Sequence, residues 1–424
     1  MQRMMLSALF LAILLGNACA FTPVKPVSSD QFSSLHATKN IETRSMNRPK
    51  TACPVFEDEV FETTGVTLTR FMVEVAILNP GLREITMLFG AVETACKAIA
   101  NLVKRSPLPS SETLGYEENA NLQGEAQKKL DVSASEVLKR ALRFTGKIGV
   151  LASDEDDALV DVVGTSNSDA REVVINESER YVCVFDPLDG SFNIDAGIST
   201  GTILGIYEHD ESCNVVDYRI DEDCTEQEAQ CLANTLQPGT NLVAAAYCLY
   251  SSSTFLVLTL GNGVYMFVLD DQIGEFVLSR PNVRIPEVST ILSFNEDNLD
   301  RWDPPMRETV LKWRKGVGKS GKKFSSRYIG SMVGDMHRTL LYGGVFGYPS
   351  DTHNPNGKLR LLYEGAPMSF IVEQAGGIST TGTQRVMDVM PAVVHQRVPV
   401  IMGSKQDVEE VIEAYSNWDH HFDE

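Results

Sequence analysis

An apolar run that leads directly into a tight turn with two aspartates constrains this chain more than any other feature. The run, Tyr181–Phe185, is of strand type, and the turn after it reads Asp-Pro-Leu-Asp-Gly-Ser. The proline stiffens the turn, and Gly190 lets the backbone approach a bound group closely. Asp186 and Asp189 can face one point, with the Leu188 carbonyl between them, and such oxygen ligands suit Mg²⁺ or Mn²⁺. A surface turn stabilised by an aspartate is the alternative interpretation.

A second acidic segment follows another apolar strand. Ile148–Ala152 leads into Ser-Asp-Glu-Asp-Asp, which begins at Ser153. If both strands lie in one sheet, their acidic ends meet at a common edge, where α/β proteins bind ligands. A run of four acids is otherwise typical of a solvated turn. Asp131, taken alone, is a helix N-cap.

The order of periodic segments predicts a layered α/β or α+β fold. Helices are predicted over Thr67–Leu78, Glu84–Val103, Leu130–Phe144 and Pro367–Ala375. Strands are predicted over Ile148–Ala152, Tyr181–Phe185, Ile203–Tyr207, Leu242–Tyr250, Phe255–Leu260 and Val264–Leu269. Loops are predicted over Ser106–Gln123 and over the acidic segment Glu208–Glu228. The eight cysteines include no CxxC motif, which argues against zinc, and the length excludes a small disulfide scaffold.

The net charge limits the possible partners of the chain, and the N-terminal sequence indicates its cellular destination. The net charge is −20, and residues 51–424 alone carry 31 basic and 55 acidic residues, a net charge of −24. Such an acidic body disfavours nucleic acid as a partner. Residues 1–20 combine Arg3, a short apolar run and small residues before Ala20, which predicts a cleaved signal peptide and no membrane span in the mature form. Residues 21–50 are rich in Ser, Thr, Pro and basic residues, as in a transit peptide. For residues 1–20, a buried N-terminal helix is the alternative.

Several ordered motifs resemble those of the fructose-1,6-bisphosphatase family. The longest runs from Asp186 to Tyr207, and the others are Lys129–Val132, Ser326–Ser331, His337–Leu340, Asn356–Glu364, Pro367–Gly377 and His395–Pro399. Together they extend from about Thr67 to the C-terminus, which is far more specific than any single pattern. The resemblance implies the αβαβα sugar-phosphatase fold. It also implies a metal-binding subdomain over residues 54–282, with an acidic cysteine loop at 208–231, and a sugar-phosphate-binding subdomain over 283–424.

The resemblance implies a role for each matching position. The metal shell would comprise Asp154, Glu155, Asp186, Asp189, Glu364 and the Leu188 carbonyl. Two or three Mg²⁺ ions, or Mn²⁺, would bridge the scissile 1-phosphate and the attacking water. Glu136 and Glu155 match the acids that orient and deprotonate that water, and Asp131 is the third predicted catalytic residue. The 1-phosphate would be held by Gly190, Ser191 and Arg360.

The other phosphate would be held by Asn295, Tyr328, Tyr348 and Lys358, with Arg327 supplied by a neighbouring subunit of a homotetramer. Taken singly, either tyrosine would be a half-buried core aromatic. Two positions depart from the family pattern: Asp154 stands where Glu is usual, and Phe192 where a second Ser is usual. We therefore expect slower or differently metal-tuned catalysis.

Regulation is predicted from the same resemblance. Leu82, Arg83 and Glu208 replace residues that bind AMP in inhibited members, so AMP inhibition is expected to be absent. The acidic loop carries Cys213, Cys224 and Cys231. Cys213 and Cys231 match thioredoxin-sensitive positions of plastid-type members, whereas Cys224 is additional, and unpaired surface thiols are the alternative.

The resemblance implies an enzyme that converts fructose 1,6-bisphosphate to fructose 6-phosphate and phosphate, in plastid carbon fixation or sugar synthesis. The sequence around Ala20 and Phe21 resembles the bipartite presequence of algae with complex plastids, and secretion is the alternative. A sedoheptulose-1,7-bisphosphatase, a non-catalytic or redox-regulatory relative with a decayed metal site, and a broad inositol-phosphatase-like enzyme are the rival functions. Asn295 favours the fructose enzyme.

Overall fold

The computed structural model describes residues 51–54, 65–108, 116–120, 126–154, 160–161, 180–209, 232 and 234–419. All of them belong to one compact unit, residues 48–424. The predicted signal and transit segments, Glu155, and the three cysteines of the acidic loop lie outside the described residues.

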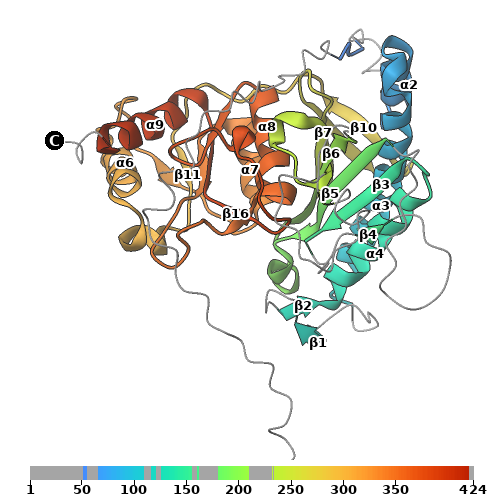
Figure 1. Ribbon diagram of the computed structural model, residues 1–424, viewed down its shortest axis with the longest axis horizontal. Coiled ribbons are helices and arrows are strands. Elements are labelled where there is room, and N and C mark those ends of the chain that lie inside the picture. Colours follow the sequence, from blue (N-terminus) through green and yellow to red (C-terminus); the bar gives the residue numbers. More distant parts are fainter. Residues whose placement is uncertain are drawn as a thin grey trace, which may run out of the picture. The chain divides into compact units, whose positions relative to one another are not determined.

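A mixed sheet of eight strands carries the first part of the unit (Figure 1). Its order is β10-β9-β8-β7-β6-β5-β3-β4, and β3 and β5 are the parallel pair among antiparallel neighbours. The strands are β3 (Ile148–Ser153), β4 (Val160–Asp161), β5 (Tyr181–Asp189), β6 (Thr200–Glu208), β7 (Leu242–Tyr250), β8 (Thr254–Thr259), β9 (Tyr265–Asp270) and β10 (Glu275–Arg280). All but the last residue of β5 and of β6 are buried, as expected for strands covered on both faces.

Three helices cover one face of this sheet. They are α2 (Leu68–Leu78), α3 (Arg83–Arg105) and α4 (Lys129–Arg143). Their apolar residues form one core cluster with Cys183 and Phe185 of β5, because alternate residues of a strand share a face. The stretch Pro80–Arg105 is apolar and long enough to cross a membrane, but half of its apolar window is buried inside the protein, as in a core helix.

The opposite face packs against two helices, and a second sheet lies on the other side of these helices. The helices are α7 (Met332–Tyr342) and α8 (Ala366–Gln374). The second sheet, in the order β12-β11-β13-β17-β15, comprises β12 (Ser325–Ser326), β11 (Ile291–Ser293), β13 (Val345–Tyr348), β17 (Val400–Gly403) and β15 (Ile378–Thr380). Val182 and Val184 of β5 share one core cluster with Phe346 of β13 and Met402 of β17.

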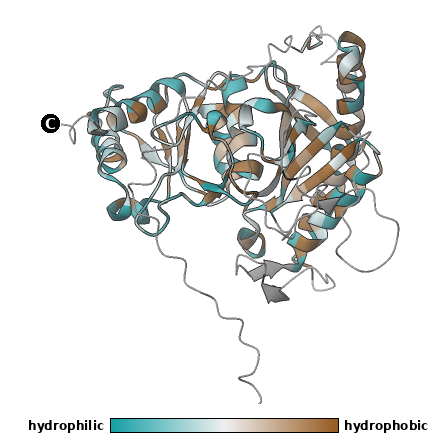
Figure 2. Ribbon diagram, viewed as in Figure 1, coloured by the Kyte–Doolittle hydropathy of each residue, from teal (hydrophilic) through white to brown (hydrophobic). Residues whose placement is uncertain are grey.

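Two further helices, α6 (Pro304–Lys315) and α9 (Lys405–Asp419), cover the far face of the second sheet. Trp313 of α6, Val408 of α9 and Ile401 of β17 belong to a third core cluster. The layers therefore alternate helix, sheet, helix, sheet and helix, which confirms the predicted αβαβα fold. In Figure 2 the strands of the eight-stranded sheet are largely hydrophobic, whereas polar residues are frequent on the outer helices.

The remaining described elements are short. They are the strand pairs β1 (Tyr116–Ala120) with β2 (Ala126–Lys128) and β14 (Leu359–Arg360) with β16 (Arg397–Val398), the 3₁₀ helices η2 (Pro80–Leu82), η3 (Ser191–Ala196), η5 (Gly239–Asn241), η6 (Glu296–Arg301) and η8 (Val386–Asp388), and the π-helix η7 (Leu361–Gly365). The predicted helices and strands are confirmed. The prediction of a continuous loop over Ser106–Gln123 is wrong, because β1 lies inside it; β1 is polar and pairs with β2 alone, so no hydrophobic alternation indicated it.

Candidate active site

The acidic ends of β3 and β5 lie side by side at one edge of the eight-stranded sheet. The two strands run parallel with Ser153 opposite Phe185, and the backbone N–H of Asp154 donates to the Phe185 carbonyl at 3.2 Å. β5 continues as far as Asp189, beyond the predicted end of the strand. The prediction that the acidic strand ends meet at a common edge is confirmed for Asp154, and residues 155–157 lie outside the described residues.

Asp186, Asp189 and Glu364 form a cluster, called here the carboxylate cluster. One oxygen from each residue lies within 4.8 Å of the others. Glu364 comes from the π-helix η7, a rare turn that is frequent at functional sites. Asp186 and Glu364 are 7% and 5% exposed, and Asp189 is partly buried. The fold thus brings together three of the residues predicted to bind metal.

Burial and mutual repulsion disfavour the charged forms of this cluster. Burial raises the pKa of Glu364 to about 8; Arg360 opposes this increase, and the carboxylates of Asp154 and Asp189 add to it. Burial also raises the pKa of Asp189 to about 6. A divalent cation would remove the repulsion among the three carboxylates. Because the donors are all oxygens, the cluster fits a hard cation of the Mg²⁺ type.

Buried hydrogen bonds hold the turn that carries the two aspartates. The Leu188 N–H donates to Asp186 Oδ1 at 3.0 Å, and the Thr202 hydroxyl donates to the Pro187 carbonyl at 2.8 Å. The Thr202 and Tyr250 hydroxyl oxygens lie 2.8 Å apart, and both residues are buried. Such supporting bonds orient the ligands of a metal site. Sequence reasoning missed Thr202 and Tyr250, although Thr202 lies within the longest motif.

The N-terminus of α7 meets the same turn. Asp189 Oδ2 accepts hydrogen bonds from Ser331 Oγ at 3.1 Å and from the Val333 N–H at 3.0 Å. Free N–H groups at a helix N-terminus stabilise negative charge. Gly190 has a φ of +72°, and a Cβ there would lie 2.9 Å from Ser331 Cβ. Any larger residue would therefore push the turn away from α7.

Four other predicted residues lie in two polar pairs. Asp154 Oδ1 lies 2.7 Å from Arg360 Nε, and the two side chains are 11% and 10% exposed. Ser191 Oγ donates to Asp131 Oδ2 at 2.9 Å, and Asp131 is buried. The backbone N–H of Arg360 donates to Glu364 Oε2 at 2.6 Å, which places the first pair beside the carboxylate cluster.

Two predicted residues are exposed. The Glu136 side chain is 48% exposed and lies 3.5 Å from Arg140 and 3.9 Å from Lys139, both on its own helix. Arg327 is also exposed, and its Nη1 donates to the carbonyl of Ser326. The described contacts of these two side chains are therefore local.

Asn295, Tyr328, Tyr348 and Lys358 form a second group, called here the tyrosine group. β12, β11 and β13 run parallel, and at their carboxyl ends Tyr328 follows β12, Asn295 follows β11 and Tyr348 ends β13. The two tyrosine hydroxyls are hydrogen-bonded to each other, and Lys358 Nζ lies 5.6 Å from the centre of the Tyr348 ring. The group thus offers hydroxyls and a cation at the edge of a parallel set of strands, a common position for ligands.

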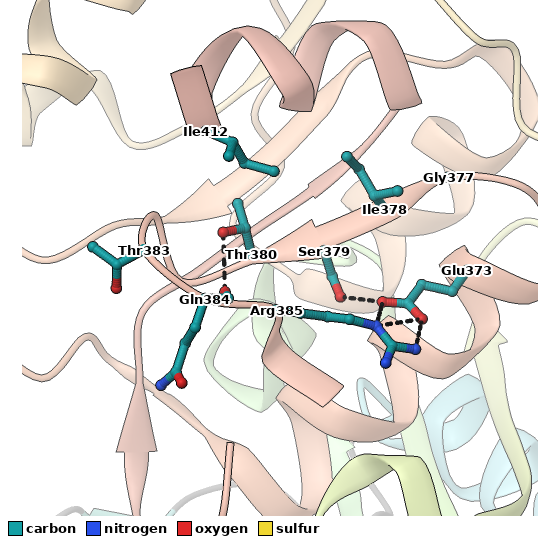
Figure 3. Close-up of a pocket in the computed structure, with 9 residues that line it drawn as sticks. All are labelled: Glu373, Gly377, Ile378, Ser379, Thr380, Thr383, Gln384, Arg385 and Ile412. Atoms are coloured by element: carbon teal, nitrogen blue, oxygen red, sulfur yellow. Dashed lines mark hydrogen bonds and ion pairs between the residues drawn. The ribbon is translucent and has the colours of Figure 1, made fainter. Parts of the chain in front are cut away.

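A pocket of about 450 Å³ lies elsewhere in the fold, beside β15 and α9 (Figure 3). Its lining includes no predicted site residue. Arg385, the cation in the lining, has Nε 3.0 Å from Glu373 Oε1 and Nη1 2.9 Å from Asp388 Oδ1. Because two carboxylates occupy this guanidinium, we do not assign the pocket to an anionic substrate.

The five-layer fold, with the carboxylate cluster at one sheet edge and the tyrosine group at another, defines the class of α/β sugar phosphatases. Family models for the N-terminal and C-terminal domains of fructose-1-6-bisphosphatase match residues 66–281 and 285–416. The chain belongs to the fructose-1,6-bisphosphatase family, whose members are phosphoric monoester hydrolases.

Individual relatives agree with this assignment. The chain is 49% identical over 346 residues to the chloroplastic fructose-1,6-bisphosphatase of Triticum aestivum, covering 82% of this chain and 80% of the relative. It is 48% identical over 345 residues to chloroplastic fructose-1,6-bisphosphatase 1 of Arabidopsis thaliana, covering 81% and 79%. The holo crystal structure of Leishmania major fructose-1,6-bisphosphatase superposes with a TM-score of 0.72 at 38% identity, covering 83% of this chain and 99% of that one.

Proposed function

We propose that this chain hydrolyses fructose 1,6-bisphosphate to fructose 6-phosphate and phosphate in a plastid. The observation that carries the proposal is the buried carboxylate cluster of Asp186, Asp189 and Glu364, in a chain about half identical to chloroplastic enzymes of this name. A metal-loaded cluster of this kind suits phosphoryl transfer, where catalysis is mostly positioning and charge neutralisation.

The carboxylate cluster would hold two or three Mg²⁺ ions together with the Leu188 carbonyl, Asp154 and Glu155. The ions would neutralise charge on the phosphoryl group and lower the pKa of the attacking water. The chain's own contribution is to aim the ligands: Thr202 fixes the turn through the Pro187 carbonyl, and α7 fixes Asp189.

The side chains around the cluster bind and orient the 1-phosphate. Arg360, held by Asp154, presents a guanidinium that suits phosphate oxygens. The Ser191 hydroxyl, which donates to Asp131 in this structure, would turn to donate to a phosphate oxygen, and Gly190 beside it leaves room for close approach of the backbone. Glu136 and Glu155 are the proposed acids that orient and deprotonate the water, and Asp131 is the third proposed catalytic residue.

The tyrosine group would bind the phosphate that is not cleaved. The tyrosine hydroxyls and Asn295 donate hydrogen bonds, and Lys358 adds charge. Arg327 is exposed, as required of a residue that serves a neighbouring subunit, and we propose that it completes the site in a homotetramer.

The proposed regulation differs from that of AMP-inhibited relatives. Glu208 stands where AMP-inhibited relatives carry an arginine, so a phosphate would meet a carboxylate there instead of a cation; the partner of Glu208 is Arg180, with Nη2 2.5 Å from Glu208 Oε1. Reduction of a disulfide among Cys213, Cys224 and Cys231 by thioredoxin is proposed to activate the enzyme. Entry into the plastid would use the bipartite presequence of residues 1–50.

Phosphate release from fructose 1,6-bisphosphate, followed against Mg²⁺ concentration with and without a dithiol, tests the proposal. Metal-dependent release stimulated by the dithiol supports both the activity and the redox control. Metal-dependent release that is indifferent to the dithiol keeps the enzyme and discards the switch. Release from sedoheptulose 1,7-bisphosphate alone would reassign the substrate, and no release from either would indicate a decayed site.

A further inference from the structure

A five-residue segment, residues 327–331, links the carboxylate cluster to the tyrosine group. It starts after β12 and ends with Ser331, the N-cap of α7. Near its first end, the Tyr328 hydroxyl is hydrogen-bonded to that of Tyr348. At its other end, Ser331 Oγ donates to Asp189 at 3.1 Å. A shift of this short segment would therefore move groups at both places.

Asp335 of α7 holds the middle of the segment. Its side chain is fully buried and accepts the backbone N–H of Ile329 at 3.0 Å and that of Gly330 at 3.1 Å. The Gly330 carbonyl accepts from Asn193 Nδ2 at 3.2 Å, and Asn193 lies directly beyond the metal-binding turn. Both backbone polar groups of Gly330 are thus fixed, one to α7 and one to the turn.

The hydrogen bonds of Asp335 and Arg338 to this segment are called here the brace. Arg338 extends the brace to the strand ends. Its Nη2 lies 2.5 Å from Asp335 Oδ1 and 2.5 Å from Ser293 Oγ, and it also contacts the carbonyl of Arg327. Ser293 is the last residue of β11. The side chains of Arg338 and Asp335 are 18% and 0% exposed, and removing one partner of such a pair leaves an uncompensated buried charge. The brace therefore favours one arrangement of the segment.

We propose that Asp335 and Arg338 are positioning residues that couple the two sites, so that a sugar monophosphate bound at the tyrosine group tightens metal binding at the carboxylate cluster. The phosphate restrains Tyr328, the brace passes that restraint to Ser331, and Ser331 holds Asp189. When the cluster is already ordered, metal binding costs less conformational entropy. The metal therefore binds more tightly, which is a positive coupling between the two sites. By linkage, the metal tightens monophosphate binding by the same factor. The identity of the two sites rests on the proposed function, whereas the coupling requires no turnover.

Mn²⁺ binding to the purified protein, measured by electron paramagnetic resonance with and without saturating fructose 6-phosphate, tests the coupling. For the native chain we expect the sugar phosphate to tighten Mn²⁺ binding by about 5-fold to 20-fold, within the usual range of coupling between sites. In Asp335→Asn and Arg338→Met the factor should fall below about 2-fold. Arg338→Lys keeps the charge but not the several donors of the guanidinium, so it should give an intermediate factor.

Asp407→Asn is the matched control. Asp407 is also a buried carboxylate that accepts a backbone N–H from another segment, that of Ser289 at 2.9 Å, but it lies on α9 outside both groups. This variant should lose thermal stability and keep the native coupling factor. Thermal unfolding and circular dichroism of every variant show whether the fold is retained.

Three outcomes would overturn the proposal: native coupling in both Asp335→Asn and Arg338→Met, an equal loss of coupling in Asp407→Asn, or no coupling in the native chain although both ligands bind. If the native chain shows coupling but releases no phosphate from the bisphosphate, the proposed hydrolysis fails and the brace stands.

Discussion

The carboxylate cluster and the tyrosine group differ in their charge and in their burial. The cluster places three acidic side chains within 4.8 Å in a buried setting, where their charges repel. The tyrosine group consists of neutral hydroxyls and an amide around one exposed cation, Lys358, at the edge of the second sheet. The first arrangement is unfavourable until a cation arrives, whereas in the second the two tyrosine hydroxyls are hydrogen-bonded to each other.

Under the proposed function, this difference places the chemistry in the carboxylate cluster and substrate recognition in the tyrosine group. Three buried carboxylates destabilise the folded chain when no metal is bound. Metal ions that bind between them would restore the lost free energy of folding. Hydroxyls and a solvated lysine bind a phosphate without activating it, so they contribute equally in the ground and transition states. Substitutions in the cluster should therefore lower kcat, and those in the tyrosine group should raise KM.

Glu364→Gln should have the largest effect. It removes one of the three carboxylates proposed to hold the metal ions, and we expect kcat to fall by about 10³-fold or more. The same change removes repulsion from a buried site, so the metal-free variant should unfold at a higher temperature than the native chain in EDTA. Steady-state kinetics and thermal unfolding check the two parts. A variant that retains kcat would remove Glu364 from the metal site.

Thr202→Val tests how far the cluster depends on its support. The substitution preserves shape but leaves the Pro187 carbonyl and the Tyr250 hydroxyl without their partner, so the turn loses a fixed position. We expect the Mg²⁺ concentration for half-maximal activity to rise by about 10-fold to 100-fold. Mn²⁺ binding without substrate provides an independent measurement.

Thr259→Val is the control for that experiment, since Thr259 is a buried threonine that donates to the Gly263 carbonyl at 2.7 Å, in β8. It should lose stability without a change in metal requirement. Thr202→Ser retains the hydroxyl and should behave like the native chain. Equal metal requirements in the two valine variants would contradict the supporting role of Thr202.

The sequence predicted the parts of this comparison that depend on neighbours along the chain. Asp186 and Asp189 follow an apolar strand within one turn, so their convergence could be derived locally. Glu364 was predicted from the family resemblance alone, because a distant segment brings it to the cluster. Its raised pKa depends on burial, which no local pattern specifies.

The supporting residues were not predicted, for a related reason. Thr202 and Tyr250 lie in apolar strands, where such residues usually belong to the core. Asp335 has the position of an ordinary first-turn acid on α7, and only the structure shows the two backbone N–H groups that it accepts. Fold class follows from periodicity, whereas hydrogen bonds between distant segments follow from packing.

Lys358→Met should have a smaller effect than either cluster experiment. The side chain is exposed, so its charge acts through water, and we expect KM for fructose 1,6-bisphosphate to rise by about 10-fold while kcat stays within about 2-fold. Lys322→Met, at another exposed lysine outside both groups, should leave both constants unchanged. A fall in kcat comparable to that of Glu364→Gln would contradict the division between chemistry and recognition.

The pH dependence of stability gives the smallest and most selective test of the two regions. Burial raises the pKa of Glu364 from 4.5 to about 8, so between these values the folded metal-free chain holds a proton that the unfolded chain has lost. The free energy of unfolding should then decrease as pH rises through about 8. The tyrosine group should not contribute, because burial moves the pKa of Tyr328 upward from 10.0, far from neutral pH.

The measurement is the unfolding temperature between pH 6.5 and 8.5, in EDTA and in saturating Mg²⁺. This window lies above about 6, where Asp189 and Asp407 titrate, so the slope reports mainly on Glu364. We expect the unfolding temperature to fall by a few degrees with rising pH in EDTA, and to fall less or even rise in Mg²⁺, because the cation competes with the proton for the carboxylates. Glu364→Gln should flatten the EDTA curve. If the unfolding temperature of the native chain does not change with pH in EDTA, ionisation of the cluster does not destabilise the fold. That result would contradict the electrostatic difference between the two regions.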